Sequence, residues 1–470
     1  MSSIGMAAGG DRQITARIER LPLSAWHFKV GVAIGSGWFF DAFDALAIAY
    51  VLPVLIGMWK LAPSQIGLLI SIPYIGQIIG SIFFGWLAER IGRVPVTLYT
   101  LLIFSIMSLV CAFAASYEQM VAFRFLQGLG LGGEIPIMAA YISEFAAAHR
   151  RGRFAMTYQI LFVIGLVAVA LVGAQVVPRL GWQWMFYIGA LPAVLVLPFR
   201  YLLPESPRWL ASRGRHEEAD RVLAQIEDEI SRGGAKPLPP VPSNVPPVPP
   251  ASTRIGDLFK SIYLRRTLSV WTIWFCVYFI TYGLVVWVPS LYRTVFNAPV
   301  PDALRYGFFT SFAGLVGAVI SILLIDKLGR KPIMAVSQLI SAVPLLVVAH
   351  QTGMAVTDVV ALVCISFGFN NMNSIMLSMY TAELYPTELR ALGCGIGNAW
   401  LRFASVIGPF MVGAVLPGGA RATPEQLAAG MSSVFVVFGA FAVVGGLVAG
   451  LFAVETRGAA LEKLSPSLSR

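Results

Sequence analysis

The chain has 470 residues, of which 57% are hydrophobic and only 12% are charged, and its mean hydropathy is +0.75. A soluble domain carries about twice that share of charge, so the composition excludes an ordinary soluble globular protein. The net charge of +10 could suggest a nucleic-acid partner. The basic residues, however, gather between apolar windows on one predicted side, so they indicate membrane orientation and no nucleic-acid contact.

Apolar windows of about 20 residues recur along the chain, and each is long enough to cross the hydrocarbon core of a bilayer. Most Lys and Arg residues fall in alternate connections, which places both termini in the cytoplasm. The sequence predicts twelve membrane spans, at 28–57, 64–86, 95–115, 118–143, 154–176, 183–203, 267–296, 304–324, 333–349, 356–381, 394–416 and 427–453. It therefore divides into a cytoplasmic segment (1–27), a first bundle (28–203), a linker (204–266), a second bundle (267–453) and a tail (454–470).

The first window contains two acids, Asp41 and Asp44. An acid near the bilayer centre costs roughly 2.5–3.5 kcal/mol on insertion scales. The three-residue spacing places both acids on one helical face. They therefore predict a polar interior that serves an ion or a substrate. The alternative is that neighbouring polar side chains in the bundle simply hold them.

Two short motifs occur twice at nearly the same offset. Gly92–Arg93 and Gly329–Arg330 are 237 residues apart, and Tyr141–Glu144 and Tyr380–Glu383 are 239 apart. The repeat indicates duplication of a six-helix half, and glycine permits a tight turn after each helix. Acids and arginines there can pair across neighbouring helices and hold the cytoplasmic side shut, or they can serve topology alone. The candidate gate residues are Gly85, Glu89, Arg90, Gly92, Arg93, Glu144, Arg151, Asp326, Gly329, Arg330, Glu383 and Arg390.

The linker between the halves combines a surface helix with a proline-rich stretch. His216–Ile230 is amphipathic, and eight of the fifteen residues in Lys236–Pro250 are proline. Such a stretch is typical of an extended spacer, and a ligand for an SH3-type domain is the less favoured alternative. The four cysteines lie inside predicted spans without paired spacing, so we expect neither a disulfide framework nor a metal site.

The polar residues inside the later spans suggest an anion site. Arg402 lies near mid-depth of the eleventh span, where a permanent charge requires an anionic or carbonyl-rich partner. A substrate carboxylate can accept two hydrogen bonds from its guanidinium. The alternative is a permanent salt bridge to Asp41, Asp44 or Glu134, and a mixed version has an acid hold Arg402 until the substrate takes it. The other candidate substrate-binding residues are Tyr282, Tyr278, Trp274, Asn370, Asn373, Asn398, Gln159 and Phe40.

The buried acids are also candidates for proton coupling. A carboxyl group that experiences both burial and a nearby cation can bind and release a proton. We expect Asp44 and Glu134 to carry the proton, with Asp41 as a structural partner. The glycines Gly128, Gly130, Gly132 and Gly133 form a small-residue strip in the fourth span, which favours close helix packing. No strand precedes them, so phosphate binding is not expected.

Several motifs together resemble the major facilitator superfamily. They are GWLAERIGR, RFLQGLGLGG, PESPRWL, DKLGRK and ETRG, and they cover nearly the whole chain. Glu89 stands where the superfamily often has Asp, which keeps the charge. The resemblance implies an all-α fold of twelve helices in two six-helix bundles, alternating access and a monomer. It gives Arg124 a role in proton exchange or helix packing, whereas snorkelling to the membrane interface is an equal alternative.

Within that superfamily, GWFFDAFD and GLGLGGEIP resemble bacterial niacin transporters and aromatic acid/proton symporters, which are related to synaptic vesicle glycoprotein 2-like proteins. The seventh and eleventh spans resemble organic anion carriers, in which an arginine matching Arg402 faces the anion and a tyrosine matching Tyr282 lines the pocket. We therefore expect a non-enzymatic carrier of the bacterial inner membrane, without a cofactor, that imports nicotinate by proton symport. Benzoate-type acids come next, then a sugar or organic cation, and then a membrane sensor without transport.

Overall fold

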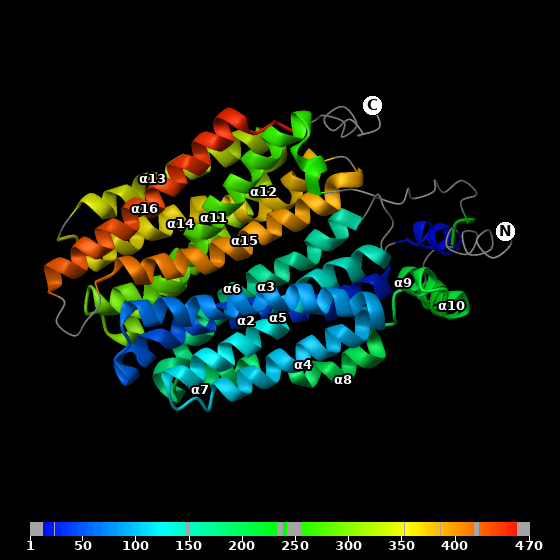
Figure 1. Ribbon diagram of the computed structural model, residues 1–470, viewed down its shortest axis with the longest axis horizontal. Helices are drawn as coiled ribbons and strands as arrows, with labels where there is room; N and C mark the ends of the chain where they lie inside the picture. The colour runs from blue at the N-terminus through cyan, green and yellow to red at the C-terminus, as the bar shows by residue number, and fades with distance from the viewer. Residues whose placement is uncertain are drawn as a thin grey trace.

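The computed structural model describes residues 13–22, 24–145, 151–232, 238–241, 255–351, 353–385, 387–417 and 423–457. Throughout these ranges the chain is helical, with turns between helices and no strand. The helices form two bundles that lie side by side with their long axes roughly aligned (Figure 1). This arrangement confirms the predicted all-α fold, because eleven of the helices are long and apolar enough to cross a membrane.

The first bundle contains α2 (Ala25–Trp59), α3 (Pro63–Ile91), α4 (Arg93–Cys111), α5 (Tyr117–Phe145), α6 (Arg151–Leu180), α7 (Gln183–Gly189) and α8 (Pro192–Leu202). The second contains α11 (Ser261–Thr294), α12 (Val300–Leu328), α13 (Arg330–His350), α14 (Val356–Leu384), α15 (Thr387–Val415) and α16 (Pro424–Phe452). Each predicted span lies on these helices, and α6 is the twelfth membrane helix of the fold. The sixth span is interrupted at Ala190–Leu191, so that α7 and α8 share it.

The glycine strip of α5 packs against α3. A Cβ atom added at Gly132 would lie 2.1 Å from the carbonyl oxygen of Gln77, and one added at Gly128 would lie 2.1 Å from that of Pro73. Real Cβ atoms do not approach so closely, and only a residue without a side chain allows this contact. The structure confirms the expectation of close helix packing.

The linker helices cap one end of the first bundle, which we call the linker end. Here α9 (Pro207–Ser212) and α10 (His216–Arg232) lie beyond the membrane helices (Figure 1). The surface helix was predicted correctly. Most of the proline-rich stretch and the tail after residue 457 lie outside the described residues.

Sequence reasoning missed a short helix at residues 13–19 that packs on α10. Arg17 and Arg20 both donate to Glu227, at 2.8 and 2.7 Å. Burial alone would raise the pKa of Glu227, but the hydrogen bonds from the two arginines lower this pKa below its ordinary range. The signal was the four-residue spacing of Ile14 and Ile18, which are both buried.

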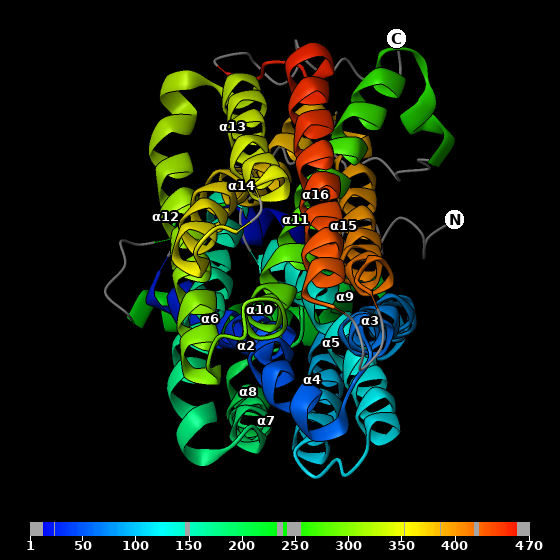
Figure 2. The same cartoon turned by 90° about the vertical axis from the view of Figure 1, so that its left-hand side faces the viewer.

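The two bundles approach each other toward the end opposite the linker helices, which we call the far end (Figure 1). Figure 2 views the molecule from that end, with the second bundle above the first. Among the described residues, three hydrogen bonds cross between the bundles: Tyr50–Ser311, Ser71–Val406 and Gln77–Arg402. At the far end, Gly67 on α3 packs against Gly413 on α15. The contacts between the bundles involve α2, α3 and α6 of the first bundle and α11, α12 and α15 of the second.

Candidate functional site

Arg402 lies on α15 at the interface between the bundles. Its Nη1 donates a hydrogen bond to Oε1 of Gln77 on α3, and its side chain is half-buried. No ion pair to Arg402 occurs within the part of the chain that the structure describes, although it is close enough to Asp41 to interact electrostatically. The alternative of a permanent salt bridge between Arg402 and an acid is therefore not found in this conformation. The hydrogen-bond partner of Arg402 is instead the neutral amide of Gln77.

Asp44 forms a buried ion pair with Arg124. Nη1 of Arg124 lies 3.0 Å from Oδ2 of Asp44, and the side chains are 1% and 0% exposed. Gln127 donates to Oδ1 of Asp44 at 2.6 Å and accepts from Arg124 at 2.7 Å. The alternative of Arg124 snorkelling to the membrane interface is wrong, because its charge is satisfied inside the bundle.

Glu134 and Asp41 are the buried acids without such a partner. Glu134 is fully buried, and neither of its carboxylate oxygens has a hydrogen-bond partner. A Cβ atom added at Gly37 on α2 would lie 2.3 Å from this Oε1. The absence of a side chain at Gly37 therefore leaves space for the Glu134 carboxyl group. Asp41 is 3% exposed and interacts electrostatically with both Glu134 and Arg402. The two acids and the arginine thus form one cluster of ionisable side chains.

Three of the candidate substrate-binding residues form an aromatic stripe on α11. Trp274 stacks on Tyr278 with ring centroids 5.3 Å apart, and Tyr278 stacks on Tyr282 at 6.2 Å. Tyr282 also meets Tyr74 of α3 edge to face at 5.2 Å, which joins the two bundles. Trp274 is 1% exposed and donates to Thr381 at 2.9 Å, so it packs within the second bundle and leaves Tyr282 as the ring nearest the other bundle.

Most of the predicted amides serve helix packing. Asn370 donates to Thr281 at 2.9 Å and accepts from Gln338 at 3.2 Å. Asn373 donates to Ser337 at 2.8 Å, while its buried Oδ1 has no partner.

Asn398 is exposed, one turn before Arg402. Of the remaining predicted residues, Phe40 is half-buried and packs on Phe39, and the side chain of Gln159 lies outside the described residues.

At the linker end the predicted charges pair within the first bundle. Arg93 at the start of α4 bridges Glu89 at 2.8 Å and Glu144 at 3.1 Å. Glu205, which follows α8, accepts from the backbone N–H groups of Arg93 and Val94. Burial raises the pKa of Glu205. The turn requires Gly92, whose φ is 113°.

The second bundle repeats this arrangement. Arg330 pairs with Glu383 at 3.2 Å, and Glu455 accepts from the N–H groups of Arg330 and Lys331, each at 3.0 Å. Gly329 has a φ of 95°. Burial acts to raise the pKa of Glu455, but four backbone N–H groups lower it below its ordinary value.

The described pairs at the linker end stay inside one bundle, so closure of the cytoplasmic side by these charges stays a prediction. The side chains of Arg151, Asp326 and Arg390 lie outside the described residues. Arg90 covers the ring of Trp86 at 4.2 Å instead of joining the pairs, and Gly85 faces open space.

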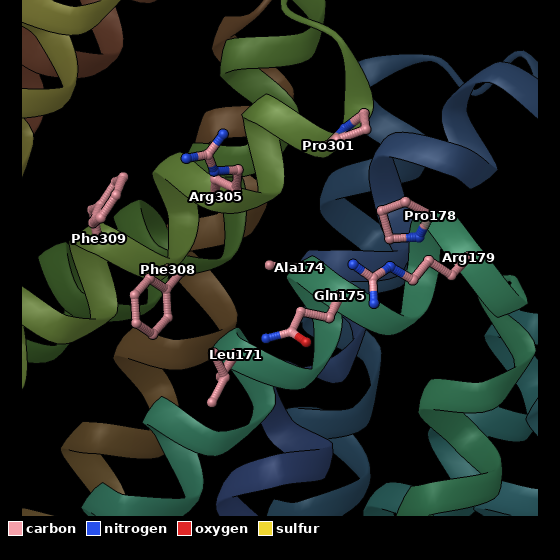
Figure 3. A pocket seen from close by; sticks show the side chains of 9 residues that line it. All are labelled: Leu171, Ala174, Gln175, Pro178, Arg179, Pro301, Arg305, Phe308 and Phe309. Atoms are coloured by element: carbon pink, nitrogen blue, oxygen red, sulfur yellow. The ribbon is translucent and has the colours of Figure 1, made fainter.

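A separate groove of about 470 Å³ lies between the C-terminal part of α6 and the start of α12. Gln175 and Arg179 extend from α6 toward Phe308 and Arg305 on α12 (Figure 3). Arg305 lies 3.9 Å from Asp302. The groove belongs to the far-end contact between the bundles, and sequence reasoning assigned nothing to it.

Sequence reasoning also missed three polar residues of the site: Tyr74, Gln77 and Gln127. All three are buried or nearly so. Their signal was present, because a buried amide or hydroxyl in a membrane span needs a partner. Only the fold shows that Gln77 faces Arg402 and that Gln127 faces Asp44.

Two bundles of membrane-spanning helices joined along ionisable and aromatic side chains are the architecture of a membrane transporter. Residues 32–468 match the family model described as "Sugar (and other) transporter". The chain belongs to this family, which lies within the major facilitator superfamily.

Named relatives agree with the family. The niacin transporter NiaP of Acinetobacter baylyi is 33% identical, with 96% of this chain and 99% of the relative covered. A putative niacin/nicotinamide transporter NiaP of Bacillus subtilis is 31% identical over 82% of this chain and 87% of the relative. The organic cation/carnitine transporter 7 of Arabidopsis thaliana is 26% identical, with 96% of each covered.

Solved structures agree with the fold. A D-xylose–proton symporter superposes with a TM-score of 0.71 at 20% identity, with 93% of this chain and 100% of that chain covered. A bacterial homologue of the human lysosomal transporter Spinster, in an inward-facing conformation, has a TM-score of 0.70 at 18% identity, with 92% and 98% covered.

Proposed function

We propose that the protein imports a small aromatic monocarboxylate together with protons, with nicotinate as the first candidate and benzoate-type acids as the second. The observation that carries this proposal is Arg402, a permanent cation at the contact between bundles whose described hydrogen-bond partner is a neutral amide. A carboxylate offers two charged acceptors in the geometry of the guanidinium. The names of two relatives, which mention niacin, support the same substrate class.

The neighbouring side chains suit a flat ring and a proton. Tyr282 and Tyr74 present ring faces and edges beside Arg402, and aromatic pairs contribute about 0.5–1.5 kcal/mol beyond burial of their area. Glu134 is the favoured proton carrier, because its buried oxygens have no partner. Asp44 is held by Arg124 and Gln127, so we assign the second carrier role to Asp41 and the structural role to Asp44. This reverses our sequence-based expectation for the two aspartates.

The proposal extends to the setting of the carrier. We place the protein in the inner membrane of a bacterium as a monomer, with the linker end in the cytoplasm. Because the bundles are joined toward the far end, this conformation is then closed to the outside. Substrate would be released toward the linker end in this conformation, as expected for alternating access.

The test is counterflow in proteoliposomes that contain the purified protein and labelled nicotinate, with and without an imposed pH gradient. We expect competition by benzoate, weak competition by nicotinamide, and none by glucose or a quaternary amine. Arg402→Lys keeps the charge but not the bidentate geometry, so uptake should fall at least about tenfold. Wild-type uptake in either Arg402→Lys or Arg402→Ala, or inhibition by the quaternary amine alone, contradicts an anion site at this arginine.

A further inference from the structure

The contact between α3 and α15 runs along one face of each helix. From the far end inward, the contacts are Gly67 on Gly413, the hydrogen bond from Ser71 to the carbonyl oxygen of Val406 at 2.8 Å, and the hydrogen bond between Gln77 and Arg402. The last of these is the innermost, and it is the one that involves a charged side chain. It therefore lies where the contact between bundles meets the proposed substrate site.

Gln77 has little freedom to withdraw from this position. Its side chain is 2% exposed, and its backbone is packed against Gly132 of α5 so closely that an added Cβ atom would lie 2.1 Å from the Gln77 carbonyl oxygen. The backbone of Gln77 is thus held by the first bundle, whereas the partner of its side chain belongs to the second. Any movement of α3 away from α15 must break this bond.

Arg402 is not matched in charge by Gln77. The bond from Arg402 to Gln77 joins a cation to a neutral oxygen, whereas a carboxylate brings the opposite charge and accepts two hydrogen bonds from the guanidinium at once. A guest carboxylate can therefore replace the Gln77 amide, while a neutral guest that offers one carbonyl oxygen gains nothing over it. Asp41 lies near enough to act on Arg402 electrostatically, but no ion pair joins the two among the described residues.

We propose that Gln77 is a positioning residue that holds Arg402 in the empty carrier and releases it to an anionic guest, so that anion binding loosens α3 from α15. This inference rests on the proposed function, since it requires a carboxylate substrate. It predicts that the partner of Arg402 controls both affinity and the contact between bundles. Tyr74 lies one turn from Gln77 and touches Tyr282 across the same contact, so the release would reach the aromatic pair as well.

The test compares Gln77→Ala and Gln77→Glu with Ser71→Ala, a control whose side chain also bonds from α3 to α15 but to a backbone oxygen. Equilibrium binding of nicotinate and benzoate to purified protein is the first readout. Gln77→Ala should bind them about three- to tenfold more tightly, because a hydrogen bond to a charged group no longer competes. Gln77→Glu should bind at least about tenfold more weakly although Arg402 is unchanged, and Ser71→Ala should match the wild type.

The second readout needs no substrate. Spin labels at Lys60→Cys and Glu425→Cys, one exposed site on each bundle at the far end, report the distance between bundles. In the empty protein, Gln77→Ala should lengthen the distance between the two labels relative to the wild type, and Gln77→Glu should not. If no aromatic acid binds the wild type, the proposed function fails while this shift still tests Gln77. The inference is overturned if both Gln77 variants have the same label distances and the same affinities as the wild type.

Discussion

Asp44 and Arg124 form an ion pair that the protein removes entirely from solvent, with 3.0 Å between Oδ2 and Nη1. Gln127 bonds to both partners, so each charge has a second hydrogen-bonding neighbour. Taking one charge away from such a pair leaves the other uncompensated, which is more damaging than replacing both. This pair therefore fixes α2 against α5 close to the proposed proton site.

The buried pair predicts non-additive effects on stability. Arg124→Gln should destabilise the protein by about 3–5 kcal/mol, because Asp44 then stays buried without its cation. The double variant Asp44→Asn with Arg124→Gln should cost clearly less than Arg124→Gln alone. Thermal unfolding of the purified protein in detergent measures both changes, and Arg305→Gln at an exposed position serves as the control. Equal losses for the single and double variants contradict an interaction between the two charges.

Close packing of α5 on α3 predicts a different kind of loss. Gly132→Ala places a Cβ atom 2.1 Å from the Gln77 carbonyl oxygen, so the helices must separate and about 1–3 kcal/mol of stability should be lost. Gly57→Ala is the matched control, because nothing lies within 4 Å of its added Cβ atom and alanine is favoured in a helix by about 1 kcal/mol. Unfolding temperatures should fall for the first variant and hold or rise for the second.

The fold could be predicted from the sequence because membrane spans depend on local hydropathy, and twelve windows together with a repeated loop motif already determine two bundles. The site could be predicted only in part. Arg402, Glu134 and the two aspartates are conspicuous because charge is rare in a span. Their hydrogen-bond partners, Gln77 and Gln127, are not conspicuous in the sequence. Only the packing of α3 against α15 and of α5 against α2 shows which charged residues they bond to. The amides of α14 were ambiguous for the same reason, and the packing shows that Asn370 and Asn373 bond to neighbouring helices.

The repeated turns at the linker end predict unequal effects of two matched acids. Burial raises the pKa of Glu205, whereas backbone N–H groups lower the pKa of Glu455 despite its burial. Ionised Glu455 therefore stabilises the fold above its unfolded pKa of about 4.3, and this contribution disappears as the pH falls through its lower folded pKa. Because the folded pKa of Glu205 is raised, its contribution to stability is present at low pH and is lost as the pH rises through that folded pKa.

At pH 7 we therefore expect Glu455→Gln to lower the unfolding temperature more than Glu205→Gln does. The difference between Glu455→Gln and the wild type should shrink when unfolding is measured at pH 4. Gly92 and Gly329 have similar positive φ values beside these acids, so backbone geometry does not explain the asymmetry. A larger loss for Glu205→Gln at pH 7 contradicts the assignment.

The helix at residues 13–19 predicts an acid-sensitive contact. Glu227 accepts hydrogen bonds from Arg17 and Arg20, and these bonds lower its pKa although burial acts to raise it. The contact is then strongest above the unfolded pKa of about 4.3 and weakens as the pH falls through the lower folded pKa of Glu227. Hydrogen exchange at residues 13–22 should accelerate as the pH is lowered from 6 to 3.5, after correction for the intrinsic rate.

Glu227→Gln should show the fast exchange already at pH 6, whereas Glu217→Gln, which changes an exposed acid on the same helix, should behave as the wild type. Slow exchange in Glu227→Gln at pH 6 would mean that the apolar contacts of Ile14 and Ile18 hold the segment without the charges.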